Sequence, residues 1–120
     1  MANENDLQII RIEEVPQGFR VIKFNGIMDE ETSSEARAKI EPMIADKNFK
    51  NLVFDLAGLS YINSKGIGFL VAMQAHLSKD DQKLAVVNPN EAVSDVMSLV
   101  GINQIIGMYN SLDEAYQGMV

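Results

Sequence analysis

The sequence contains no cysteine and only one histidine, His76. Without cysteine the chain cannot form a disulfide, and it offers no thiolate to a metal ion. A single imidazole leaves little for a zinc site of the common structural or catalytic kind. We therefore expect neither a metal site nor a cofactor.

The sequence also lacks a long apolar run. No stretch approaches the ~20 consecutive apolar residues that a membrane-spanning helix needs, and the densest segment, 66–75, is short and contains Gln74. The first six residues are polar and acidic, without the basic and apolar regions of a secretory signal. We expect a cytoplasmic protein with no membrane partner.

Basic residues are outnumbered, since 10 Lys and Arg face 17 Asp and Glu and the net charge is −7. Nucleic-acid binding needs clustered cations, so we predict no nucleic-acid partner. The charge favours solubility and a protein partner with a basic surface. An apolar fraction of 47% in 120 residues can build one core. We expect one domain over 1–120, with residues 1–6 flexible.

Strand-like and helix-like patterns alternate along the chain. Alternating or continuously apolar runs predict strands at 7–15, 19–24, 52–56, 84–87 and 105–109. Helical spacing predicts helices after Asp29 and at 64–78, 91–100 and 111–119. The first two strands, joined by Pro16-Gln17-Gly18, are typical of a hairpin. The order ββαβαβαβα predicts an α/β fold with a mixed, largely parallel five-stranded sheet and about four helices.

Several local features carry more specific expectations. Pro42 should kink or shorten the first helix. Residues 57–60 should form a loop after the central strand. Ser111, followed three residues later by Glu114, predicts a capping box. The third helix should bury one apolar face, made of Val93, Val96, Met97 and Val100.

The segment that carries chemistry joins the central strand to the next helix, over residues 55–68. Ser64 falls where that helix should begin, beside unpaired N–H groups and the positive end of the helix dipole. A serine there is most often an N-cap. The same place would also suit a phosphate, with Lys65 adding positive charge. Gly66 and Gly68 would let a partner surface approach closely. On the residues alone, cap and phosphorylation switch both stay open.

Five segments in the right order resemble landmarks of the STAS domain, the family of anti-sigma factor antagonists. The central one is Asn63-Ser64-Lys65-Gly66-Ile67-Gly68, which is similar to the family's Asp-Ser-(small)-Gly-(apolar)-Gly. The others lie at 26–29, 86–89, 99–102 and 111–115. The resemblance covers nearly the whole chain and implies a single STAS domain of bacterial origin.

The resemblance implies a partner-switching function in transcription regulation. Ser64 would be phosphorylated by a serine protein kinase that is also an anti-sigma factor. The unphosphorylated form would bind that partner and release a sigma factor, and a serine phosphatase of the PP2C type would remove the phosphate. ATP would bind the kinase, so this chain would be no enzyme. The partner-binding residues would be Asp29, Asn63, Ser64, Lys65, Gly66 and Ile67.

Two residues depart from the family pattern. Asn63 stands where Asp is usual, and Lys65 stands where a small residue is usual. Both changes lower the like-charge repulsion against a phosphate on Ser64, but they equally fit a member that has lost switching. The alternative function is therefore a constitutive STAS scaffold that binds partners without phosphorylation.

Other functional classes fit less well. Asp55, predicted to end the central strand, would suit a receiver-like phosphoacceptor, but that chemistry needs neighbouring carboxylates for Mg²⁺, and no lysine follows Lys83. For an enzyme, no glycine-rich loop leads into Lys-Ser or Lys-Thr. Ser64 and His76 lie about three turns apart on one helix, which does not suit a nucleophile and its base. No residue pattern names a lipid or small-molecule ligand, so that possibility stays open.

Overall fold

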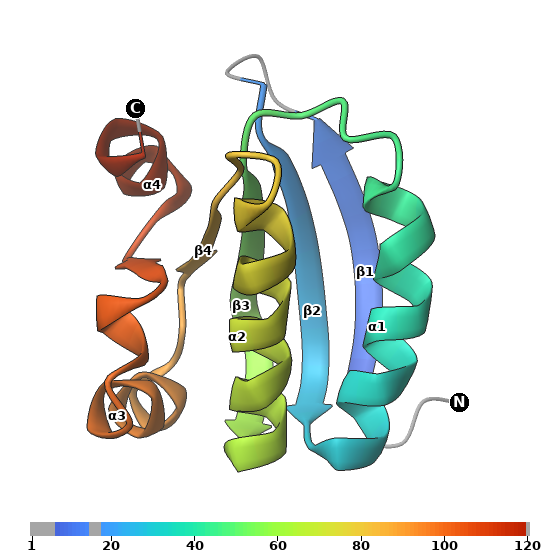
Figure 1. Cartoon of the computed structure of the whole chain (residues 1–120). Helices are drawn as coiled ribbons and strands as arrows, with labels where there is room; N and C mark the ends of the chain where they lie inside the picture. The colour runs from blue at the N-terminus through green and yellow to red at the C-terminus, as the bar shows by residue number, and fades with distance from the viewer. Residues whose placement is uncertain (1–6, 15–17, 120) are drawn as a thin grey trace.

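The structure is a computed structural model that describes residues 7–14 and 18–119. Its strands within these ranges are β1 (Leu7–Glu14), β2 (Arg20–Met28), β3 (Leu52–Ile62), β4 (Leu84–Val87) and β5 (Gly107–Tyr109). Its helices there are α1 (Glu30–Ile44), α2 (Ser64–Ser78), α3 (Glu91–Leu99), α4 (Leu112–Gly118) and the short 3₁₀ helix η1 (Ile102–Gln104). The predicted order of strands and α-helices is confirmed (Figure 1).

The strands form one sheet in the order β1-β2-β3-β4-β5. β1 pairs with β2 antiparallel, and each later pair is parallel, so the prediction of a mixed, largely parallel sheet is confirmed. Residues 1–6, which we expected to be flexible, lie outside the described residues, and so does most of the predicted hairpin turn. Gly18, at the end of that turn, has a φ of 82°, which glycine adopts without steric cost.

The two faces of the sheet are covered by different helices. Successive strand residues point to opposite faces, so Ile22 belongs to the core cluster that contains residues of α1, α2 and α3, whereas Val21 belongs to the cluster that contains Ala115 of α4. Figure 1 shows α1 and α2 side by side in front of the sheet. Among the described residues, no helix combines the length and the apolar character that crossing a membrane requires. The layers bring the start of α1 and the start of α2 to one end of the molecule.

The central strand is longer than predicted. β3 continues to Ile62, where we expected a loop from residue 57. It keeps pairing with β2 through two register shifts, and the Ser60 hydroxyl donates to the Gly26 carbonyl oxygen at 3.1 Å. Leu59 and Ile62 are buried, whereas the small and polar residues between and before them are exposed. The sequence of this segment resembles that of a loop because these residues lie on the solvent side of an irregular strand.

Other element ends differ slightly from expectation. α1 includes Pro42 and ends two residues beyond it, at Ile44. β5 begins at Gly107, two residues later than predicted, because Ile105 is the C-cap of η1 and the N–H groups of Ile105 and Ile106 both donate to the Ile102 carbonyl oxygen. Ser111 caps α4 as predicted, and its hydroxyl accepts from the Glu114 N–H at 3.1 Å. The Glu114 carboxylate, however, accepts from the Asn110 N–H rather than from the cap residue, which leaves the predicted capping box half formed.

Candidate functional site

The start of α2 lies at the edge of the sheet where the parallel strands β2 and β3 end. α1 follows β2 and α2 follows β3, so both helices begin at this edge (Figure 1). The Asn63 N–H donates to the Met28 carbonyl oxygen at 3.2 Å and ties the two junctions together. Asp29 and Ser64 are far apart in sequence, yet they stand at the starts of neighbouring helices.

Asn63, not Ser64, is the N-cap of α2. Its side-chain oxygen accepts from the N–H groups of Lys65 at 3.0 Å and Gly66 at 3.1 Å. Ser64 is the first helical residue and is exposed, and within residues 18–119 its hydroxyl has no hydrogen bond. The interpretation of Ser64 as the cap is therefore wrong, and the Ser64 hydroxyl takes no part in capping α2. The sequence held the signal, because Asn caps helices as well as Ser does.

This division of roles predicts different stability effects at two adjacent residues. Replacing Asn63 by alanine should lower the free energy of unfolding by about 1 kcal/mol, because two N–H groups lose their acceptor. Replacing Ser64 by alanine should change it by less than ~0.5 kcal/mol, as for other exposed side chains without a special role. Urea unfolding followed by circular dichroism measures both. Equal losses of unfolding free energy in the two variants would show that Ser64 contributes to capping as much as Asn63 does.

Asp29 caps α1 through a capping box with Thr32. The Thr32 N–H donates to the Asp29 carboxylate at 3.0 Å, and the Asp29 N–H donates to the Thr32 hydroxyl at 2.9 Å. The bond from the Thr32 backbone is the main cause that lowers the pKa of the Asp29 carboxyl group. Glu30 and Glu31 follow in the first turn, as expected for a helix start. The site therefore carries negative charge next to the beginning of α2.

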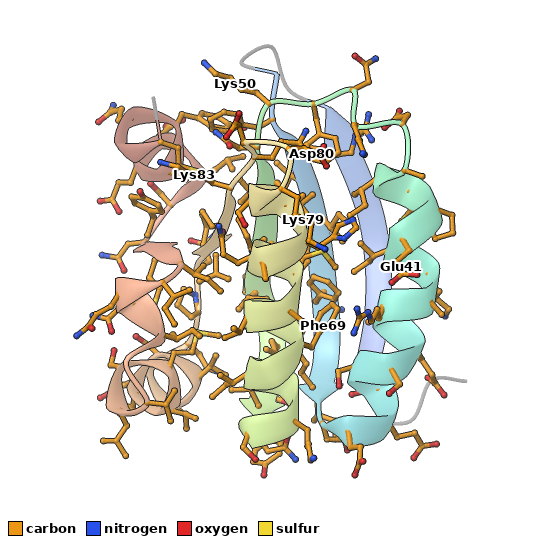
Figure 2. All side chains as sticks on the ribbon, viewed as in Figure 1. Glu41, Lys50, Phe69, Lys79, Asp80 and Lys83 are labelled. Atoms are coloured by element: carbon orange, nitrogen blue, oxygen red, sulfur yellow. The ribbon has the colours of Figure 1, made fainter. Side chains whose placement is uncertain are left out.

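An open groove of about 250 Å³ separates the first turns of α1 and α2. Glu30, Ser33 and Arg37 line it from α1, and Lys65, Gly68 and Phe69 line it from α2. Figure 2 shows Phe69 projecting into the space between the two helices. Lys65 is exposed and places a cation across the groove from the acidic first turn of α1. The groove extends the accessible surface around Ser64 toward both helices.

Two of the predicted partner-binding residues face inward. Gly66 is buried, and a Cβ atom there would lie 2.5 Å from the Met28 carbonyl oxygen. Ile67 is only 8% exposed and belongs to the core. Gly66 therefore serves the close packing of α2 on β2, and the expectation that it opens the surface to a partner is corrected. Gly68 is exposed and does fit that expectation, since a Cβ there would meet nothing within 4 Å.

We predicted that Asp55 ends its strand, and this prediction is wrong. It stands within β3, and its carboxylate accepts from the Ala57 N–H at 3.0 Å and from the Asn88 side chain at 3.4 Å. The Lys23 ammonium group lies 4.0 Å away. Among the described residues, no three His, Asp or Glu side chains are grouped so that they could hold a metal ion. This geometry gives no support to a receiver-like site at Asp55.

Sequence reasoning missed an exposed apolar patch at the end of α3, formed by Val96, Leu99 and Val100. We expected Val96 and Val100 to be buried, but they are 38% and 57% exposed, and Leu99 is 90% exposed. Val93 and Met97 are buried as predicted. The three patch residues have their own i, i+3, i+4 spacing, which was the available signal. Grouped exposed apolar side chains are typical of interaction surfaces.

Comparisons with known proteins point to one domain family. The family model described as the STAS domain matches residues 11–115. An anti-sigma F factor antagonist from Paenibacillus polymyxa is 21% identical over 95 residues, which cover 79% of this chain and 81% of that protein. The sequence relationship therefore extends over most of both chains.

Solved structures of anti-sigma factor antagonists share the fold. The protein from Mycobacterium paratuberculosis matches with a TM-score of 0.84 and 24% identity, over 98% of this chain and 97% of that one. SpoIIAA in its unphosphorylated form matches with a TM-score of 0.74 and 23% identity, over 91% and 94%. Bacillus SpoIIAA in its phosphorylated form matches with a TM-score of 0.66 and 22% identity, over 92% and 98%.

Proposed function

Because the chain belongs to the STAS domain family, we propose that it is an anti-sigma factor antagonist controlled by phosphorylation of Ser64. The unphosphorylated form binds an anti-sigma factor that is also a serine protein kinase, and this binding releases a sigma factor. Phosphorylation ends the interaction, and a PP2C-type phosphatase restores it. The protein acts in the bacterial cytoplasm and catalyses no reaction itself.

The observation that carries the proposal is the free hydroxyl group of Ser64. A serine that caps a helix is tied to the backbone, but here Asn63 performs that task. Ser64 is exposed on the first turn, and its hydroxyl has no hydrogen bond within residues 18–119. A kinase can therefore reach it without breaking the start of α2. The structures of SpoIIAA in its unphosphorylated and its phosphorylated form support the same chemistry on this fold.

The charges around Ser64 explain how a phosphate would act. Phosphorylation adds about −1.5 to −2 charge at neutral pH. Lys65 and the helix dipole tolerate that charge on the free protein. A partner whose surface fits unmodified Ser64 would have to remove the phosphate charge from water when it docks on the phosphorylated form, close to the ionised Asp29. The switch therefore needs only a local clash at the interface, with no change of fold.

The two departures from the family pattern are compatible with switching. Asn63 makes the capping bonds that an aspartate would make at this position, so the start of α2 keeps its geometry. Lys65 is exposed and lines the groove between α1 and α2, where it can contact a partner. Neither residue obstructs Ser64. Asp29, Asn63, Ser64 and Lys65 form the accessible part of the partner surface, supported from beneath by Gly66 and Ile67.

Mass spectrometry of the protein purified from its native cells tests the proposal. We expect a fraction of molecules with one added phosphoryl group, a fraction that varies with growth phase and stress, and peptide mapping should place the group on Ser64. The Ser64→Ala variant, expressed in the same cells, should lack it. An unmodified mass under every condition would favour the constitutive scaffold.

A further inference from the structure

A second cavity, of about 240 Å³, lies at the opposite end of the sheet from Ser64. It is formed where β4 and β5 begin, between the later half of α2 and the end of α4. Leu84, Ile105 and Met119 give it aliphatic walls. Leu84 is 2% exposed, whereas Ile105 is 55% exposed. The cavity therefore has a fixed apolar floor and one accessible apolar side.

The polar side chains of this cavity are hydrogen-bond donors. The Gln74 side-chain oxygen already accepts from the Leu84 N–H at 2.8 Å, which leaves its NH₂ group to donate. Lys83 contributes an ammonium group. Its backbone is fixed by a bond from its N–H to the Asn51 side chain at 3.0 Å and by one from the Leu52 N–H to its carbonyl oxygen at 2.9 Å. No carboxylate of the described residues lines the cavity.

Two glycines hold the third donor, Tyr109, in place. A Cβ atom on Gly107 would lie 2.7 Å from the Tyr109 ring, and one on Gly118 would lie 2.5 Å from it. The ring therefore fits only because both positions lack a side chain. Its hydroxyl has no hydrogen bond within residues 18–119. The cavity thus combines a placed phenol, an amide and one cation with aliphatic walls.

We propose that this cavity binds a small aliphatic carboxylate. The carboxylate accepts from Lys83 and from the Gln74 amide, and the hydrocarbon part contacts Leu84, Ile105 and Met119. One cation matches a single negative charge better than the two of a phosphate monoester. The volume is below the ~300–1,000 Å³ of pockets for drug-sized ligands, so the ligand has a short chain. This site is independent of Ser64 and of the proposed switch.

Titration of the full isotope-labelled chain with sodium hexanoate, followed by amide NMR signals, tests this proposal. We expect saturable shifts centred on Leu84, Gly107 and Gly118, with a Kd in the ~1 mM range. The neutral analogue 1-hexanol, which has the same chain length, should bind about tenfold more weakly because it lacks the charge. Equal binding of the two compounds, shifts centred elsewhere, or no saturable shift would each overturn the proposal.

A matched pair of lysine variants tests the role of the cation. Lys83→Gln should weaken hexanoate binding about tenfold, whereas Lys79→Gln should leave it unchanged. Both lysines are exposed, but Lys79 does not line the cavity. Figure 2 shows Lys83 on the α4 side of α2 and Lys79 on the α1 side. The same affinity in both variants would exclude recognition by Lys83 and overturn the proposal.

Discussion

Replacing Ser64 by glutamate is expected to weaken the complex with the anti-sigma partner by more than about a hundredfold, which corresponds to ~3 kcal/mol of binding free energy. Ser64 is exposed on the first turn of α2, so the new carboxylate lies at the surface that the partner covers. The interface must then desolvate a second negative charge close to Asp29, and like charges in a complex cost several kcal/mol. Isothermal titration calorimetry with a partner identified by co-purification measures the loss.

Two further variants at this position separate charge from size. Ser64→Gln has the length of glutamate without its charge and should lose much less affinity. Ser64→Ala should bind like the natural protein, and its complex should persist when ATP is added to a kinase partner. If glutamine and glutamate weaken binding equally, steric exclusion explains the effect. If all three variants bind with the affinity of the natural protein, the switch at Ser64 is contradicted.

Most of the fold could be predicted because most elements have a clear hydrophobic period. β4 and α2 have the predicted bounds, since a short apolar run and a mostly apolar helix leave few alternatives. The second half of β3 could not be predicted in this way. Its pairing with β2 passes through register shifts, and the small and polar residues Ala57, Gly58 and Ser60 on it are exposed. Sequence periodicity cannot distinguish such a strand from a loop.

The local structure at the beginning of α2 was predicted in position but not in detail. The start of α2 was placed correctly at Ser64, yet the capping role depends on a boundary defined to one residue, which is finer than sequence patterns resolve. The roles of Gly66 and Gly68 depend on the rotation of α2 about its axis. Residues two positions apart point about 200° away from each other on a helix, so one glycine faces β2 and the other faces solvent.

This opposition of the two glycines leads to the largest stability effect that we expect. In the Gly66→Ala variant the new Cβ would lie 2.5 Å from the Met28 carbonyl oxygen and 2.8 Å from the Ile62 side chain. Overpacking costs ~1–3 kcal/mol, and a backbone atom gives way less easily than the end of a side chain. The better helix propensity of alanine returns only up to ~1 kcal/mol. We expect the free energy of unfolding to fall by about 2 kcal/mol.

Gly68→Ala is the matched control, because it makes the same chemical change two residues later in the same helix. Its Cβ would meet nothing within 4 Å, so the gain in helix propensity should raise the free energy of unfolding by about 0.5–1 kcal/mol. Urea unfolding of both variants, with the slope of the transition compared, measures the difference.

Because Gly66 also sets the distance between α2 and β2, its replacement should shift Ser64 and weaken partner binding. Equal stability of the two variants would contradict the inward role of Gly66. If Gly68→Ala weakens binding while remaining stable, the partner must lie directly over Gly68.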